Sequence, residues 1–244
     1  MTSLVDAAAS GDIERCRSLL SPRCFNSRRV IKFINQSNKY GRTALHYASF
    51  YGHIDICKLL IEYGADVNYY DIEGFTSLHY ASHEGKFDVC VLLLKYITNF
   101  DNYYFNNKNT PLQLASKNGF LNICELLLDN GANINESNYN RKTPLFFASQ
   151  NGHIDVCKFL LKNGADLHFC SIFKISPLHR AAEGNHFEIC ALLLEYGAQP
   201  EKANTLGKRA IDCAAKYDDL YDFLENYNKY KRIYKIKKYL IYSI

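Results

Sequence analysis

The stretch from residue 41 to residue 69 recurs along most of the chain. It reads GRTALHYASFYGHIDICKLLIEYGADVNY, and related openings to T-A-L-H begin at Thr43, Thr76, Thr110, Thr143 and Ser176. The steps between these openings are 33, 34, 33 and 33 residues. A fixed period of this length predicts a solenoid, in which each helix–turn–helix repeat buries its apolar face only against its neighbours.

Each repeat carries start and turn signals for two helices. Thr or Ser at the opening can cap the first helix, because its side-chain oxygen accepts a backbone N–H bond. Pro111, Pro144 and Pro177 follow at the first helical position, where the missing N–H costs nothing. Glycine marks the turn between the helices because it adopts positive φ cheaply, and Asn185 takes that place in the sixth repeat. The repeat pattern therefore predicts an all-α chain.

The sequence of motifs within one repeat is specific. T-x-L-H, then A-S-x-x-G-H-I-D-I-C-K-L-L, then G-A-D-V-N resembles the ankyrin repeat, and the resemblance covers roughly residues 2–228. It implies an all-α ankyrin-repeat solenoid of about seven stacked helix–turn–helix units joined by β-hairpin loops. Within an array over 1–228, we expect an N-terminal capping repeat at 2–20, an insert at 21–38, full repeats over about 38–205 and a C-terminal capping repeat at 206–228. A basic tail, 229–244, follows.

Six of the nine cysteines occupy one equivalent position in successive second helices. Each lies in an apolar run such as I-C-K-L-L, where a thiol packs as a small hydrophobe. No C-x-x-C occurs, so the pattern indicates neither a metal site nor a disulfide framework. We expect buried, reduced thiols at Cys16, Cys57, Cys90, Cys124, Cys157 and Cys190.

The histidines also follow the repeat. His46, His79 and His179 lie three residues after the capping Thr or Ser, and His53, His153 and His186 follow the turn between helices. The resemblance implies that such histidines are structural and form hydrogen bonds between turns. No glycine-rich phosphate loop, H-E-x-x-H or nucleophile elbow is present. The sequence predicts a protein without enzymatic activity, cofactor, metal or small-molecule substrate.

Binding is then expected on the variable surface. The resemblance implies contacts through the hairpin tips and through the exposed side of the first helices, which line a concave groove. Aromatic and arginine clusters are typical energetic centres of protein interfaces, and exposed apolar clusters usually mark contacts. The candidate partner-binding residues are Tyr40, Arg42, Phe50, Tyr51, Phe75, His83, Glu84, Lys117, Ile172, Phe173 and Ile175. We expect a protein partner, and a monomer in its absence. The alternative is self-coverage: the insert 21–38 would cover the aromatic patch around Arg42, and the tail would cover the apolar patch of Ile172, Phe173 and Ile175.

Charge is distributed unevenly and supports a second hypothesis. Eight Lys/Arg and no acid lie between Arg15 and Arg42, six Lys/Arg and no acid lie between Lys229 and Lys238, and the residues between carry about −7. The insert 21–38 and tail 229–244 could therefore bind nucleic acid or an anionic membrane. A third reading, similarity to the proteasome-assembly chaperone gankyrin, has only the number of repeats in its favour. No apolar run reaches the ~18–20 residues of a membrane span and no signal pattern opens the chain, so we expect the cytoplasm, with the nucleus also open.

Overall fold

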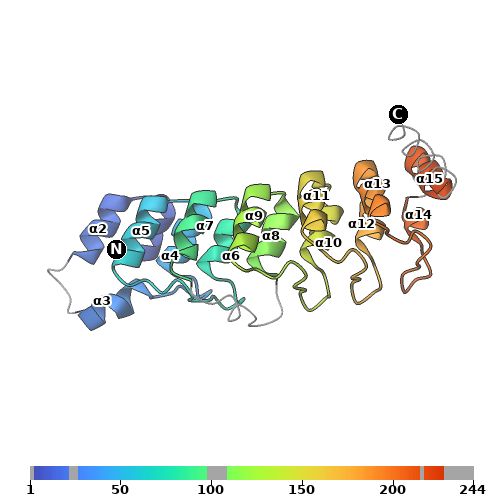
Figure 1. Cartoon of the computed structure of the whole chain (residues 1–244). Helices are drawn as coiled ribbons and strands as arrows, with labels where there is room; N and C mark the ends of the chain where they lie inside the picture. The colour runs from blue at the N-terminus through green and yellow to red at the C-terminus, as the bar shows by residue number, and fades with distance from the viewer. Residues whose placement is uncertain (1–2, 22–26, 98–108, 215–216, 228–244) are drawn as a thin grey trace, which may run out of the picture. The chain divides into compact units, whose positions relative to one another are not determined.

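A computed structural model describes residues 3–21, 27–97, 109–214 and 217–227 (Figure 1). Secondary structure in these ranges is helical, apart from an isolated bridge between Ser37 and Thr43. The chain forms two compact units, which we call the N-terminal unit (residues 1–139) and the C-terminal unit (residues 140–244) and describe separately. The predicted tail 229–244 lies outside the described residues.

The N-terminal unit contains a series of helix pairs and one additional helix, α3. First helices pack on first helices in the order α1, α4, α6, α8, and second helices pack in the order α2, α5, α7, α9. The connecting loops leave from one edge of the unit, the lower edge in Figure 1. The helices are α1 (Leu4–Ser10), α2 (Ile13–Leu20), α3 (Ser27–Ile34), α4 (Ala44–Tyr51), α5 (Ile54–Glu62), α6 (Ser77–His83), α7 (Phe87–Leu94), α8 (Pro111–Asn118) and α9 (Leu121–Asp129).

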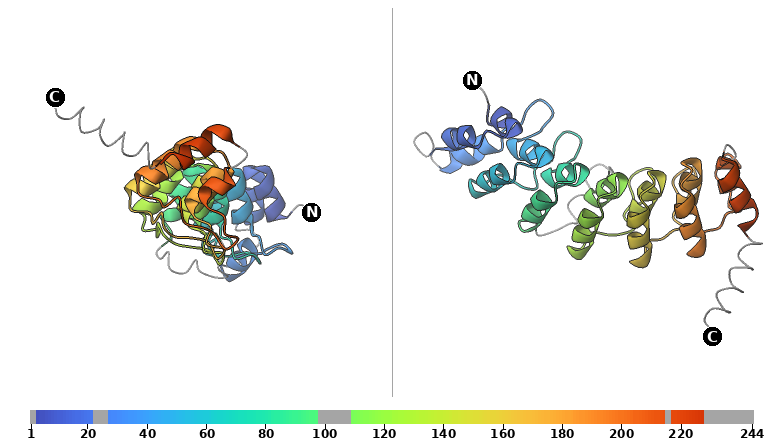
Figure 2. Two further views of the ribbon diagram at one scale, coloured as in Figure 1. Left: turned by 90° about the vertical axis from the view of Figure 1, so that its right-hand side faces the viewer. Right: turned by 90° about the horizontal axis from the view of Figure 1, so that it is seen from above.

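The C-terminal unit is built in the same way. First helices contact in the order α10, α12, α14; α11 contacts α13, and α14 contacts α15. Successive helix pairs follow one another in chain order within this unit (Figure 2). Its helices are α10 (Pro144–Gln150), α11 (Ile154–Lys162), α12 (Pro177–Glu183), α13 (Phe187–Glu195), α14 (Ala210–Cys213) and α15 (Asp218–Glu225).

The capping residues predicted from the repeat lie where the first helices begin. The hydroxyls of Thr110, Thr143 and Ser176 accept the N–H groups three residues further on, at 3.2 to 3.3 Å. Thr43 and Thr76 hold the same extended backbone position. Pro111, Pro144 and Pro177 begin their helices, as predicted.

The cysteines of the second helices are part of the core. Cys57, Cys90, Cys124 and Cys157 are fully buried, and each sulfur lies 3.5 to 3.7 Å from the hydroxyl of a serine in the preceding first helix. Burial raises the pKa of Cys57, Cys90 and Cys157 to about 12, so these thiols stay protonated. Cys16 and Cys190 are equally buried, and all six are free cysteines as expected.

Histidines of the T-x-L-H motif tie the first helices α4 and α12 to the loops that follow them. In the second repeat, the Thr43 N–H donates to His46 Nδ1 at 3.1 Å. Because Nδ1 accepts this bond, the ring proton lies on Nε2, which donates to the Phe75 carbonyl at 3.0 Å. His179 makes the equivalent bonds to the Ser176 N–H and the Lys208 carbonyl. These residues are structural, as the resemblance implied.

At the loop tips the chain reverses direction as in a hairpin, but it forms no paired strands in the described ranges. An Asn or Asp at the start of the tip accepts two backbone N–H bonds from the residues that follow. Asn38, Asp71 and Asn204 do so at 2.8 to 3.1 Å. Consecutive tips are joined by single bonds, from the Ile72 N–H to the Tyr40 carbonyl and from the Thr205 N–H to the Phe173 carbonyl. These side-chain bonds add to the backbone bond that closes each tip, from the N–H groups of Asn38, Asp71 and Asn204 to the carbonyls four residues further on.

The turn between the two helices of the sixth repeat gives a first testable prediction. Asn185 has φ +56°, in the left-handed region that the equivalent Gly152 occupies at +80°. We expect Asn185→Ala to destabilise the C-terminal unit by about 1 kcal/mol, because alanine is strained there. Asn185→Gly is the matched control and should change stability by less than about 0.5 kcal/mol, since lost strain and added unfolded-state entropy offset each other. Urea unfolding measures both. An alanine variant as stable as the glycine variant would contradict the assignment.

Candidate functional site

A continuous row of aromatic and arginine side chains lies on the N-terminal unit. The Arg42 guanidinium carbon is 5.7 Å from the Tyr40 ring centre and 5.2 Å from that of Tyr80. The Phe50 ring lies 6.1 Å from the Tyr80 ring and 5.0 Å from the Tyr51 ring, each with an edge-on geometry. We call Tyr40, Arg42, Tyr80, Phe50 and Tyr51 the aromatic row. It joins a loop tip to the first helices α4 and α6.

The two ends of the aromatic row are the most accessible. Tyr40 is 46% exposed and Tyr51 is 49% exposed, whereas Phe50 and Tyr80 are half-buried. Phe75 is half-buried beside the row, with its ring 6.1 Å from that of Tyr80. The structure therefore brings together five of the predicted binding residues, Tyr40, Arg42, Phe50, Tyr51 and Phe75.

Asp71 holds the middle of the row in place. Its carboxylate is buried and accepts bonds from the Tyr80 hydroxyl at 2.6 Å and from Arg42 Nε at 3.2 Å. The other oxygen accepts the Glu73 and Phe75 N–H bonds of the loop tip. Burial alone would raise the pKa of Asp71, but these four bonds lower it below its usual value. One carboxylate thus fixes both a turn and two members of the row.

Asp71 and Tyr80 were not among the residues predicted from the sequence. A signal for Tyr80 exists, because Tyr47 and Tyr80 both follow the histidine of the motif, where later repeats have Leu114, Phe147 and Arg180. The position of Asp71 resembles an ordinary turn residue, since Asn38 and Asn204 hold the same place. Only its contact with Arg42, 29 residues away, distinguishes it.

The described part of the insert contacts the loop that leaves α5. The insert 21–38 contains the helix α3, and Ile34 at its end is buried. Asn35, which follows, donates to the Gly64 carbonyl and accepts the Asp66 N–H, so it binds the loop that leaves α5. At the end of the insert, the Asn38 side chain accepts the backbone N–H groups of Tyr40 and Arg42, two members of the aromatic row.

The remaining predicted residues of this unit follow on the same side of the first helices. His83 and Glu84 form a pair at 2.6 Å at the end of α6. Asn118 donates to the His83 carbonyl at 3.0 Å and so links α8 to α6. Lys117 is exposed in the last turn of α8. Phe50, His83 and Lys117 hold equivalent places in successive repeats, so this position changes from aromatic to polar along the unit.

In the C-terminal unit the predicted apolar patch lies at a loop tip. Ile172 and Phe173 are exposed, Phe173 by 58%, and Ile175 is half-buried where its N–H donates to the Ser171 hydroxyl. The next tip adds Leu206, which is 80% exposed and was not predicted. The bond from the Thr205 N–H to the Phe173 carbonyl places these two tips side by side.

Two negative findings apply to the described ranges. Among those residues, no three His, Cys, Asp or Glu side chains are grouped so that they could hold a metal ion. None of the helices located there is both long enough and apolar enough to cross a membrane.

Comparison with known structures supports the fold. The crystal structure of the human ASB11 ankyrin repeat domain matches with a TM-score of 0.79 and 29% sequence identity, over 92% of this chain and 96% of that one. The ankyrin repeat domain of Bcl-3, described as a unique member of the IkappaB protein family, matches with a TM-score of 0.73. Its identity is 21%, with 92% and 98% of the two chains covered, so it bears on the fold alone.

Sequence comparison gives the same result. A curated relative, palmitoyltransferase akr1 of Schizosaccharomyces pombe, is 38% identical over 68 residues, or 28% of this chain. The chain spans about a tenth of the length of that relative, so the match gives no information about the activity of this chain. A family model for ankyrin repeats in three copies matches residues 4–106 and 97–169, and a model for ankyrin repeats in many copies matches residues 178–225. The chain belongs to the ankyrin-repeat family.

Proposed function

We propose that this chain is a non-enzymatic protein-interaction module whose main binding centre is the aromatic row of the N-terminal unit. Ankyrin-repeat domains generally bind protein partners. The observation that carries the proposal is the uninterrupted contact from Tyr40 through Arg42, Tyr80 and Phe50 to Tyr51, with half-exposed residues at both ends. Tyrosine and arginine are among the residues most enriched in the energetic centres of interfaces.

The fixed positions of the side chains in the middle of the row favour binding. Arg42 and Tyr80 are held by Asp71 before any partner arrives, so little side-chain entropy is lost when a partner docks. A partner can stack on Tyr40 or Tyr51 and still contact the edge of the Arg42 guanidinium. The polar residues His83, Glu84 and Lys117 supply hydrogen-bonding groups along the same helices, as in the rim of an ordinary interface.

The proposal is tested by partner capture. We expect Tyr40→Ala/Tyr51→Ala to weaken binding by about thirtyfold or more, which corresponds to the loss of ~2 kcal/mol typical of a central tyrosine. Proteins retained from a cell extract by the wild type would be identified by mass spectrometry, and the affinity of the principal one would then be measured with purified material.

The control removes two other exposed tyrosines. Tyr96 and Tyr196, 49% and 47% exposed, lie just after the second helices α7 and α13 and are not members of the row. Tyr96→Ala/Tyr196→Ala should retain the partner. Equal loss of partner binding in both double variants would contradict the proposal that the binding centre lies on the aromatic row. Loss only when the chain is shortened to residues 1–227, with a steep dependence on salt, would favour the electrostatic alternative instead.

A further inference from the structure

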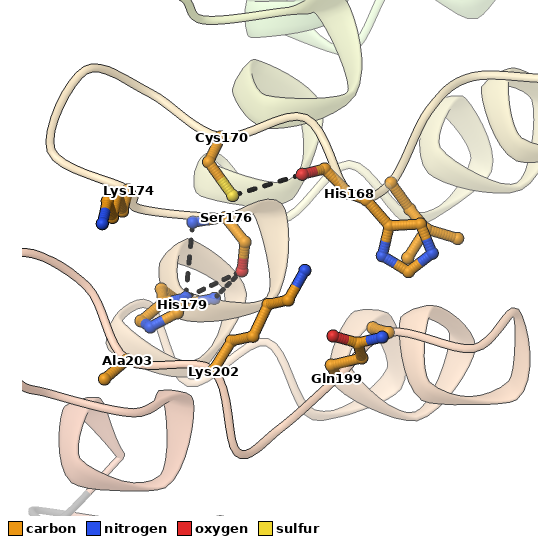
Figure 3. A pocket seen from close by; sticks show the side chains of 10 residues that line it. His168, Cys170, Lys174, Ser176, His179, Gln199, Lys202 and Ala203 are labelled. Atoms are coloured by element: carbon orange, nitrogen blue, oxygen red, sulfur yellow. Dashed lines mark hydrogen bonds between the residues drawn. The ribbon is translucent and has the colours of Figure 1, made fainter.

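The C-terminal unit contains a pocket of about 320 Å³ next to its exposed apolar tips. The loop between α11 and α12 supplies one wall with His168, Cys170 and Lys174, and the loop after α13 supplies another with Gln199 and Lys202 (Figure 3). Leu167, Ala198 and Ala203 complete an apolar lining. The volume suits one side chain of a ligand with its adjoining backbone.

The lining of this pocket includes two lysines, Lys174 and Lys202, and no carboxylate. The Lys202 side chain extends between Ser176 and Gln199, and Lys174 stands at the opposite end (Figure 3). Two nearby acids, Glu201 in the loop after α13 and Asp212 in α14, are each bound by Arg209 at 3.3 Å. Burial raises the pKa of the Cys170 thiol, and the nearby positive charges of Lys202 and Arg141 oppose this increase. The charge balance inside the pocket is therefore positive.

The surroundings indicate a polypeptide ligand. The exposed tips bearing Ile172, Phe173 and Leu206 are joined by a backbone bond and adjoin the wall that carries Lys174. A free inorganic anion would use the cations but leave these apolar side chains in water, whereas a peptide with acidic and aliphatic side chains contacts both.

We propose that this pocket binds a Glu or Asp side chain of a protein partner, flanked by aliphatic residues that lie on Phe173 and Leu206. The inference shares with the proposed function the premise that the partner is a protein. It concerns other residues in the other compact unit, and its test uses purified components only, so either idea can fail without the other.

The first experiment measures binding of a fluorescent heptapeptide of alternating Glu and Leu to the full chain. We expect saturable binding that weakens with added salt, and at least tenfold weaker binding of the matched Gln/Leu heptapeptide. Lys174→Gln/Lys202→Gln should weaken binding of the Glu/Leu peptide by about tenfold, as expected for two partly exposed charge pairs. The control Lys158→Gln/Lys162→Gln removes the same charge from exposed positions of α11 and should change it less than about twofold.

The second experiment places the peptide in the pocket. Cys170 is partly accessible, unlike the buried cysteines of the second helices, and its sulfur donates to the His168 carbonyl at 3.3 Å on the pocket wall. In a Cys24→Ser/Cys213→Ser background, a saturating amount of the Glu/Leu peptide should slow alkylation of Cys170 at least fivefold, as mapped by mass spectrometry. The proposal would be overturned if alkylation of Cys170 were unchanged or if neither peptide bound. It would also be overturned if the Gln/Leu peptide, or an oligouridylate, bound as tightly as the Glu/Leu peptide.

Discussion

Replacing Asp71 with alanine is expected to destabilise the N-terminal unit by about 3 kcal/mol, because it leaves several buried or half-buried donors without their acceptor. The lost bonds are those from the Tyr80 hydroxyl, from Arg42 Nε and from the Glu73 and Phe75 N–H groups. Urea unfolding of the variant and the wild type at pH 7 measures the change. The same variant should bind the partner more weakly, since Arg42 and Tyr80 lose the group that orients them.

Asp71→Asn is the matched control, and the chain itself justifies it. Asn38 and Asn204 hold the equivalent place and accept the two backbone bonds of their loop tips with a side-chain oxygen. Asparagine at 71 should therefore keep the turn but lose the anion, with a cost of about 1 to 2 kcal/mol. If both variants changed stability by less than about 0.5 kcal/mol, the role of Asp71 as the organiser of the row would be wrong.

The contribution of Asp71 should also depend on pH. Its pKa is lowered in the folded state, so the folded protein releases this proton more readily than the unfolded chain. The stabilisation is present above the unfolded pKa of ~3.9 and is lost as pH falls through the lower folded pKa. Asp71→Asn should therefore be less sensitive than the wild type to acid below about pH 4.

The buried histidines should make the protein less stable as the pH falls from 7 to 5. Burial lowers the pKa of His79 to about 3 and also lowers the pKa values of His46 and His179. Between the folded pKa and the unfolded value of ~6.5, the unfolded chain binds more protons, and stability must fall as pH falls. Through His79 alone, the free energy of unfolding should decrease by about 2 kcal/mol between pH 7 and pH 5. Stability above about pH 7 should be nearly constant with respect to these groups.

The fourth repeat provides the variant that isolates this effect. Gln113 replaces the motif histidine, accepts the Thr110 N–H at 3.1 Å and donates to the Glu136 carbonyl at 2.7 Å in the loop that follows. A His46→Gln/His79→Gln/His179→Gln variant should therefore fold and lose most of the decline in stability between pH 7 and pH 5. His168→Gln, at an exposed position, should leave the decline unchanged. A triple variant with the same pH dependence as the wild type would show that other groups cause it.

Much of the fold follows from local patterns. The capping Thr and Ser residues, the prolines that begin helices, the turn at Asn185 and the buried cysteines were predicted from spacing and composition, and the described residues confirm them. These features need only neighbours in the same repeat, because a helix cap or a left-handed turn is decided within a few residues. The helix α3 in the insert was not predicted, since a short apolar run of this kind is compatible with a helix or a loop.

The candidate site was only partly predictable. Tyr40, Arg42, Phe50, Tyr51 and Phe75 could be named because aromatic residues at variable positions depart from the repeat. Their connection through Tyr80 and Asp71 could not be predicted, because Arg42 and Asp71 are 29 residues apart and meet only when one loop tip stacks on the next. Likewise, Leu206 becomes notable only beside Phe173, and the pocket exists only where the loops of two repeats face each other.

The sequence by itself thus determined that this protein is an all-α repeat array, where its helices begin and which residues serve the repeat. Tertiary structure alone decided which variable side chains touch, which charge is neutralised by a neighbour and which apolar groups remain in water. The physical reason is that repeat periodicity specifies each unit locally. Exposure and pairing on the surface instead depend on the register between side chains of adjacent repeats, and no single repeat contains that information.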